Sequence, residues 1–172
     1  MSEESRDRVH RLFQEFWRLE TSLMTYLATL LKTDQFRARV VWESAGSFNQ
    51  RVNLIRNLVR CFATDDDEAY VLTALNKVDK VSKIRNDFAH SSFNHLPLRK
   101  GYSRFGTVKF HKAKGREFLE SEFVTYEEID LEIEEMRNLS MQFGARGNPG
   151  HDHLVNIESK WHREFPTDQE PS

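Results

Sequence analysis

Cysteine is nearly absent from this sequence, which has 172 residues and a single cysteine, Cys61. One cysteine cannot form a disulfide within the chain, so the composition favours a reducing compartment. Long apolar runs are also lacking, and none approaches the roughly 20 residues that a membrane helix needs. The first residues, Met-Ser-Glu-Glu-Ser-Arg-Asp-Arg, are polar and charged, unlike a secretory signal peptide. We therefore expect a soluble, cytoplasmic protein that does not interact with a membrane.

Metal ligands at fixed spacing and phosphate-binding glycine loops are lacking as well. His151 and His153 lie in a Gly/Pro-rich stretch with no further cysteine or histidine ligand at fixed spacing, so we predict no metal site. No Gly-rich loop follows a predicted strand, and no nucleophile–base pair includes Cys61, which we expect to pack within a helix. The sequence therefore indicates neither a metal nor another cofactor.

Apolar residues recur at spacings of three and four in four segments, which is typical of amphipathic helices. The expected helices span residues 5–31, 47–62, 67–89 and 125–144. Two of them begin with a capping box, formed by Ser47 with Gln50 and by Thr125 with Glu128. Residues 32–46 are expected to form a connection with a short helical or irregular piece. Its expected core anchors are Val40, Val41 and Trp42.

The segment between the third and fourth helices has no helical stripe. Glycines punctuate residues 91–124, and we predict a β-hairpin insertion there with strands at 104–111 and 116–124. After the fourth helix we expect a linker, a short docking helix at Leu154–Phe165 and a disordered tail. The predicted fold is an all-α four-helix domain at 1–144 with the insertion at 91–124, followed by 145–172.

Charge is strongly segregated along the chain, although the net formal charge is only −2. Residues 77–116 contain eleven Lys and Arg against two Asp, whereas residues 117–135 contain nine carboxylates and no Lys or Arg. A basic block concentrates anions, as a phosphate-binding surface must. The candidate substrate-binding residues are Lys83, Arg99, Lys100, Arg104, Lys109, Lys112 and Lys114. The alternative is that the two blocks pair with each other, in one chain or across a dimer.

The third expected helix ends in Lys-Ile-Arg-Asn-Asp-Phe-Ala-His, which brings Arg85, Asn86 and His90 together. Imidazole titrates near neutral pH, as a proton shuttle requires, and guanidinium matches the geometry of phosphate. Arg85 and His90 lie about 140° apart on a regular helix of 3.6 residues per turn, so they cannot easily share a small ligand. Either the helix unwinds near His90, or two copies meet and share a site. Glu20, in line with the apolar stripe of the first helix, could orient or neutralise Arg85, or simply lie at the helix edge.

The motif Arg85-Asn86-Asp87-Phe88-Ala89-His90 resembles the Arg-Asn-x-x-Ala-His motif that closes the third helix of the HEPN domain (higher eukaryotes and prokaryotes nucleotide-binding). The order of the helices is similar too, with Glu20 in a long first helix and a short second helix. The resemblance covers roughly residues 9–143, and its specific content is the six-residue motif. It implies a HEPN-like four-helix bundle that dimerises with the two motifs facing each other.

In active members of that family this arrangement forms a metal-independent endoribonuclease, frequently a toxin or an antiviral-defence effector. The resemblance implies that His90 is the general acid or base at the 2′-hydroxyl or the 5′-oxygen. Arg85 would hold the scissile phosphate, and Asn86 would orient the phosphate or the histidine. RNA is thus the expected substrate and a homodimer the expected assembly, while an antitoxin or a defence partner protein stays open.

Two alternatives to a nuclease use the same fold. One is a catalytically inactive HEPN-like regulatory or protein-interaction module, in which Arg85 and His90 cap and cross-link helices. The other binds nucleotides or nucleic acid without turnover, through the basic residues of the hairpin.

Overall fold

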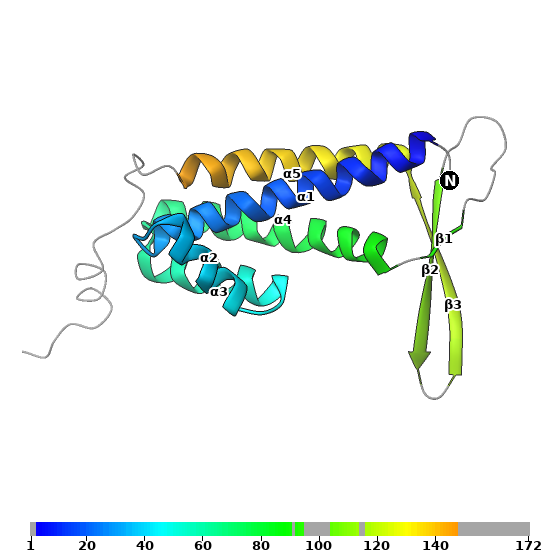
Figure 1. Ribbon diagram of the computed structural model, residues 1–172, viewed down its shortest axis with the longest axis horizontal. Coiled ribbons are helices and arrows are strands. Elements are labelled where there is room, and N and C mark those ends of the chain that lie inside the picture. Colours follow the sequence, from blue (N-terminus) through cyan, green and yellow to red (C-terminus); the bar gives the residue numbers. More distant parts are fainter. Residues whose placement is uncertain (1–2, 91, 95–103, 114–115, 148–172) are drawn as a thin grey trace, which may run out of the picture. The chain divides into compact units, whose positions relative to one another are not determined.

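The protein is mainly helical, as the computed structural model in Figure 1 shows. The structure describes residues 3–90, 92–94, 104–113 and 116–147, and from residue 90 to 123 it describes the backbone alone. The described helices are α1 (Glu3–Leu30), α2 (Gln35–Ser44), α3 (Phe48–Phe62), α4 (Asp65–His90) and α5 (Tyr126–Arg146). The strands are β1 (Ser92–Asn94), β2 (Arg104–Ala113) and β3 (Arg116–Thr125). Within these residues, no helix combines the length and the apolar character that a membrane crossing requires.

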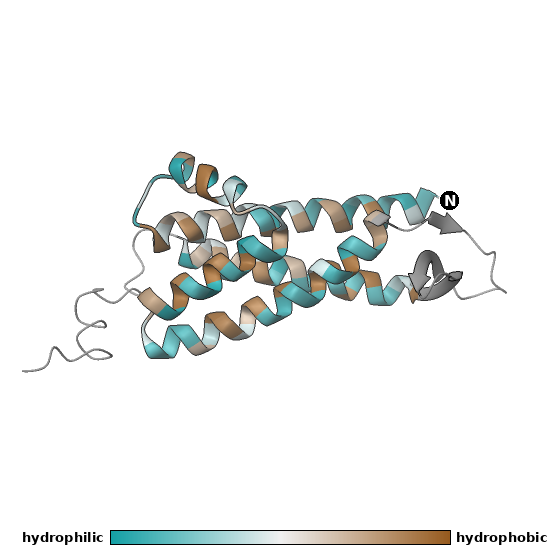
Figure 2. Cartoon of the chain, turned by 90° about the horizontal axis from the view of Figure 1, so that it is seen from below, coloured by the Kyte–Doolittle hydropathy of each residue, from teal (hydrophilic) through white to brown (hydrophobic). Residues whose placement is uncertain are grey.

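The chain divides into two compact units, and α1, α4 and α5 each contribute residues to both. The first unit consists of Met1–Glu20 and Lys80–Ser140, and the second of Thr21–Asp79 and Met141–Ser172. Hydrophobic and hydrophilic residues alternate along the helices of both units, as the colouring of Figure 2 shows. This is the pattern of helices that bury one face.

The core of the first unit comes from α1, α4 and α5. Its buried apolar side chains are Leu12, Phe16, Leu19, Val81, Phe88, Tyr126, Ile129, Ile133, Met136 and Leu139. The buried Ser5 and Tyr126 hydroxyls are hydrogen-bonded, and Arg8 contacts Asp130, so residue numbers in α1 and α5 rise together and these helices run in the same direction. The apolar periodicity of residues 125–144 predicts an inward face at Ile129, Ile133, Met136 and Phe143, and all four are buried, with Phe143 in the second unit.

The three strands of the first unit form an antiparallel sheet in the order β1-β2-β3. The pairing of β2 with β3 runs from Arg104 opposite Thr125 to Ala113 opposite Arg116. The strands therefore extend slightly beyond the expected ranges of 104–111 and 116–124. Strand β1 has only three residues, too few to show an alternating pattern in the sequence.

The second unit packs α2, α3 and parts of the three long helices around another apolar core. Among its fully buried side chains are Leu23, Tyr26, Leu27, Val52, Ile55, Val59, Val71, Leu75 and Val78. The ring of Tyr26 lies 5.7 Å from that of Phe143, centre to centre. Cys61 lies within a helix as expected, but it is exposed because Val52, Ile55 and Val59 define the inward side of α3.

Helix α2 is the short helical piece expected within the connection, and its burial pattern corrects two of the three expected core anchors. Asp34 caps the helix by accepting a hydrogen bond from the Arg37 N–H at 2.9 Å, and this bond lowers the pKa of its carboxyl. In a helix, Ala38 and Trp42 lie one turn apart on the buried side. Val40 and Val41 consequently lie elsewhere on the helix and are exposed, so only Trp42 anchors the core as predicted.

The ends of the other helices follow local signals with one exception. Both predicted capping boxes form, since Ser47 and Gln50 bond reciprocally, as do Thr125 and Glu128. Helix α5, however, does not end at Gly144 but continues to Arg146. The side chain of Arg146 is held there by Asp67 of α4 at 3.2 Å and by the ring of Tyr70, contacts that outweigh the helix-breaking tendency of glycine.

The buried face of α1 is expected to dominate stability. Leu12→Ala should lower the free energy of unfolding by about 2–5 kcal/mol, because Leu12 is fully buried and its truncation leaves a cavity. The matched control is Leu131→Ala in α5, where the leucine is 70% exposed and the change should stay within about 0.5 kcal/mol. Urea denaturation followed by circular dichroism measures both, and equal losses would show that Leu12 is not a core residue.

Candidate functional site

Helix α4 is helical through His90, the last residue of the Arg-Asn-Asp-Phe-Ala-His motif. The helix therefore does not unwind before the histidine, which was one of the two ways in which Arg85 and His90 could have met. On an unbroken helix, positions five apart lie about 140° apart around the axis. The positions of Arg85 and His90 in one chain therefore lie on different sides of α4. The side chain of His90 lies outside the described residues.

The guanidinium of Arg85 is held mainly by aromatic rings. Its central carbon lies 5.0 Å from the ring centre of Phe16 and 5.7 Å from that of Phe13, both in α1. Such cation–π contacts attract the positive charge without neutralising it. Arg85 also donates a hydrogen bond from Nη1 to Oδ1 of Asn86 at 2.9 Å. Asn86 therefore positions the guanidinium of Arg85. The resemblance implied a different role for Asn86, namely to orient the phosphate or the histidine.

Arg85 differs from most arginines in the described part of the chain because no described carboxylate forms an ion pair with it. The arginines that do form such pairs are Arg8, Arg11, Arg18, Arg37, Arg39, Arg56, Arg137 and Arg146. The Nε atom of Arg85 is buried and has no described hydrogen-bond partner. A half-buried cation whose donors are only partly used is suited to bind an anion.

The expected pairing between Arg85 and Glu20 does not appear among these contacts. Glu20 is half-buried on α1, and the described partners of Arg85 are Asn86, Phe13 and Phe16. Asp87, which directly follows the motif's asparagine, is not among those partners either. Neither neighbouring carboxylate therefore occupies the guanidinium. The sequence could not indicate the stacking on Phe13 and Phe16, because their periodicity marked them simply as part of an apolar stripe.

The candidate substrate-binding residues are distributed over α4 and the sheet. Lys83 is exposed on α4, two residues before Arg85. Arg104, Lys109 and Lys112 lie in β2, where only the backbone is described, while Arg99, Lys100 and Lys114 lie outside the described residues. The strand register places Lys109 opposite Glu120 and Lys112 opposite Glu117. Opposite charges at directly opposed positions are a favourable arrangement in a sheet.

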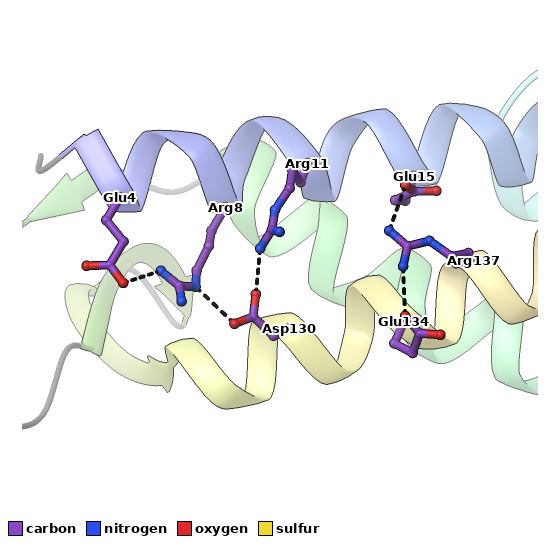
Figure 3. Close-up of polar contacts among 7 residues, drawn as sticks. All are labelled: Glu4, Arg8, Arg11, Glu15, Asp130, Glu134 and Arg137. Carbon is purple, nitrogen blue, oxygen red and sulfur yellow. Dashed lines mark hydrogen bonds and ion pairs between the residues drawn. The ribbon is translucent and has the colours of Figure 1, made fainter.

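A second polar cluster, absent from the sequence-based predictions, joins α1 to α5 (Figure 3). Asp130 accepts hydrogen bonds from Arg8 at 3.1 Å and Arg11 at 3.0 Å. Two helical turns after Arg8 in α1, the buried carboxylate of Glu15 is contacted by Arg18 at 2.8 Å and by Arg137 at 3.3 Å. Asp130, which belongs to the acidic block, thus pairs with α1 rather than with the basic block.

Part of the acidic block nevertheless responds to the basic block through electrostatics. Burial raises the pKa of Glu132, the nearby Glu135 raises it further, and Lys80 of α4 lowers it. The charges that act on Glu132 therefore come from both helices of the α4–α5 packing in the first unit. Among the residues with described side chains, no three His, Cys, Asp or Glu residues come together in an arrangement that could hold a metal ion.

The comparisons with known proteins give no relative from which a function could be transferred. No family model matches the chain, and neither a curated protein nor a solved structure matches it.

The environment of Glu132 predicts opposite effects of two neighbouring substitutions. Glu135→Gln should lower the pKa of Glu132 by removing a like charge, whereas Lys80→Met should raise it by removing an attractive one. An NMR titration of the Glu132 carboxyl measures both.

Because the folded-state pKa of Glu132 is raised, its ionised carboxylate destabilises the native protein above that pKa. Glu132→Gln should therefore stabilise the protein at neutral pH, with the difference vanishing in acid; shifts of the same sign in the two variants would contradict this account.

Proposed function

We propose that the chain is a HEPN-like helical domain that acts as a metal-independent endoribonuclease, at a site formed where two copies bring their motifs together. The observation that carries this proposal is the state of Arg85. Its guanidinium is stacked on Phe16, hydrogen-bonded to Asn86 and paired with no described carboxylate. A phosphate-binding residue requires such a positioned cation with donors to spare.

The unbroken end of α4 supports a composite site. Within one chain the helix separates Arg85 and His90 by about 140° around its axis, so one chain does not readily direct both toward one phosphate. Two copies related by a two-fold axis remove this obstacle, because Arg85 of one copy can approach His90 of the other. Each of the two equivalent clefts then contains both residue types.

The chemistry requires only groups that the RNA and the chain supply. The 2′-hydroxyl oxygen attacks the adjacent phosphorus while an imidazole of His90 accepts its proton. The bond from phosphorus to the 5′-oxygen breaks, and that oxygen takes a proton from the His90 imidazolium of the same cleft, so each cleft needs one arginine and one histidine. The products are a 2′,3′-cyclic phosphate and a 5′-hydroxyl. Arg85 stabilises the charge that develops on the phosphate oxygens, and Asn86 holds the guanidinium in place.

The first prediction from this proposal concerns the histidine. Purified protein should cleave single-stranded RNA in the presence of EDTA and leave cyclic phosphate ends. His90→Ala should lower the cleavage rate by about 10²–10⁴-fold, the usual contribution of a general acid or base. Gel electrophoresis of end-labelled RNA, with mass spectrometry of the products, measures rate and chemistry together.

The matched control is His10→Ala, which makes the same substitution at an exposed position of α1 and should leave the rate unchanged. Cleavage by the His90 variant at the wild-type rate would refute the assignment.

Mixing two inactive variants tests the composite site. Arg85→Ala and His90→Ala should each be inactive alone, but a mixed dimer contains one cleft with both wild-type residues. After random reassortment, half of the dimers are mixed and each has one of two clefts intact, so activity should return to about a quarter of wild type. No recovery in demonstrably mixed dimers would place both residues of the active site in one chain.

One observation favours a second candidate, a catalytically inactive HEPN-like regulatory or interaction module. The register opposes Lys109 and Lys112 to glutamates, which favours charge pairing over phosphate binding at these positions. This candidate predicts a stable protein partner and no growth inhibition on overexpression. Growth inhibition that depends on His90 would instead support the nuclease.

A further inference from the structure

Helix α2 has apolar side chains on two faces, and the described residues cover one of them. Ala38 and Trp42 are buried against the second unit. Phe36, Val40 and Val41 are 78%, 54% and 38% exposed, and together we call them the outer face of α2. Phe36 and Val40 are one helical turn apart and therefore lie side by side. Three exposed apolar residues within ten form a local patch rather than isolated surface hydrophobics.

The described chain stops close to this helix. The buried Gly147 accepts a hydrogen bond from Thr29 Oγ1 at 2.9 Å, which fixes the end of the described chain against the last turn of α1. A Cβ at this position would lie 2.8 Å from the Thr25 side chain, so the close approach requires glycine. On the neighbouring residue, the Ala28 carbonyl accepts a hydrogen bond from the Thr33 N–H at 3.0 Å.

These two contacts limit how far the outer face of α2 can be from the point where the chain continues. Phe36 follows Thr33 by three residues, a span of at most about 11 Å even when extended. The sequence continues for 25 residues after Gly147. Six residues separate Gly147 from Leu154 and can span roughly 20 Å when extended. A segment beginning at Leu154 is therefore within reach of α2.

The sequence of that segment supplies a matching apolar stripe. Leu154, Ile157 and Trp161 follow one another at spacings of three and four, typical of one face of a helix. We propose that residues 154–165 pack this stripe against the outer face of α2 in the same chain. The occupant is intramolecular because a short tether gives an effective concentration on the order of millimolar, which a separate protein would have to exceed. This inference does not depend on RNA cleavage.

Cysteine cross-linking in the full-length protein tests the docking without removing any of the apolar residues. In a Cys61→Ser background, Ser44→Cys places a thiol one turn beyond Val40, and Lys160→Cys places one beside Trp161. A short bismaleimide should join them within one chain, with a yield that does not change on dilution. Adding Val40→Asp should lower the initial cross-linking rate about tenfold or more, while the exposed position keeps the fold intact, as circular dichroism checks.

The matched control replaces Ser44→Cys by Asn57→Cys, on the exposed side of α3, and should give only background cross-linking. Three outcomes would overturn the proposal. The first is a rate unaffected by Val40→Asp in a folded protein, and the second is a yield no higher than that of the Asn57 control. The third is cross-linking only between chains, which would identify a second copy as the occupant of α2.

Discussion

The periodicity of an unbroken helix is the constraint on which the proposed site depends. Because α4 stays helical through His90, the positions of Arg85 and His90 lie about 140° apart around the helix axis. A helix that unwound after Arg85 would have allowed a site within one chain. With a regular helix the proposed site needs a second copy, since each cleft would take its arginine and its histidine from different chains.

The state of Arg85 depends in turn on how the first unit uses its carboxylates. Glu15 and Asp130 bind the arginines of the α1–α5 contact, and Glu134 binds Arg137. The guanidinium of Arg85 rests on aromatic rings, whose attraction leaves its charge unneutralised. The same packing therefore has two consequences. Ion pairs join α1 to α5, and Arg85 is left without a described ion pair.

Much of the helical framework was predictable because its signals are local. The capping boxes at Ser47 and Thr125 involve residues three apart, and the inward stripe of α5 repeats regularly, so both appear in the sequence as they do in the structure. Val40 and Val41 were placed wrongly because α2 is apolar on two faces, and periodicity does not say which face is covered. Helix α5 ends two residues after Gly144, near which its end was expected, and the contacts of Arg146 there are with residues distant in the sequence.

The sequence by itself determined where the long helices run, and it pointed to Arg85, Asn86 and His90 as the residues of the proposed site. Both follow from residue type and short-range spacing, which act through a helical turn or less. Only the tertiary structure decided that Arg85 stacks on Phe16, that Glu20 is not its described partner and that Asn86 positions it. The reason is physical: side chains from α1 and α4 meet through packing between segments some 70 residues apart, and no local pattern encodes which ring or carboxylate of another helix a half-buried cation will meet.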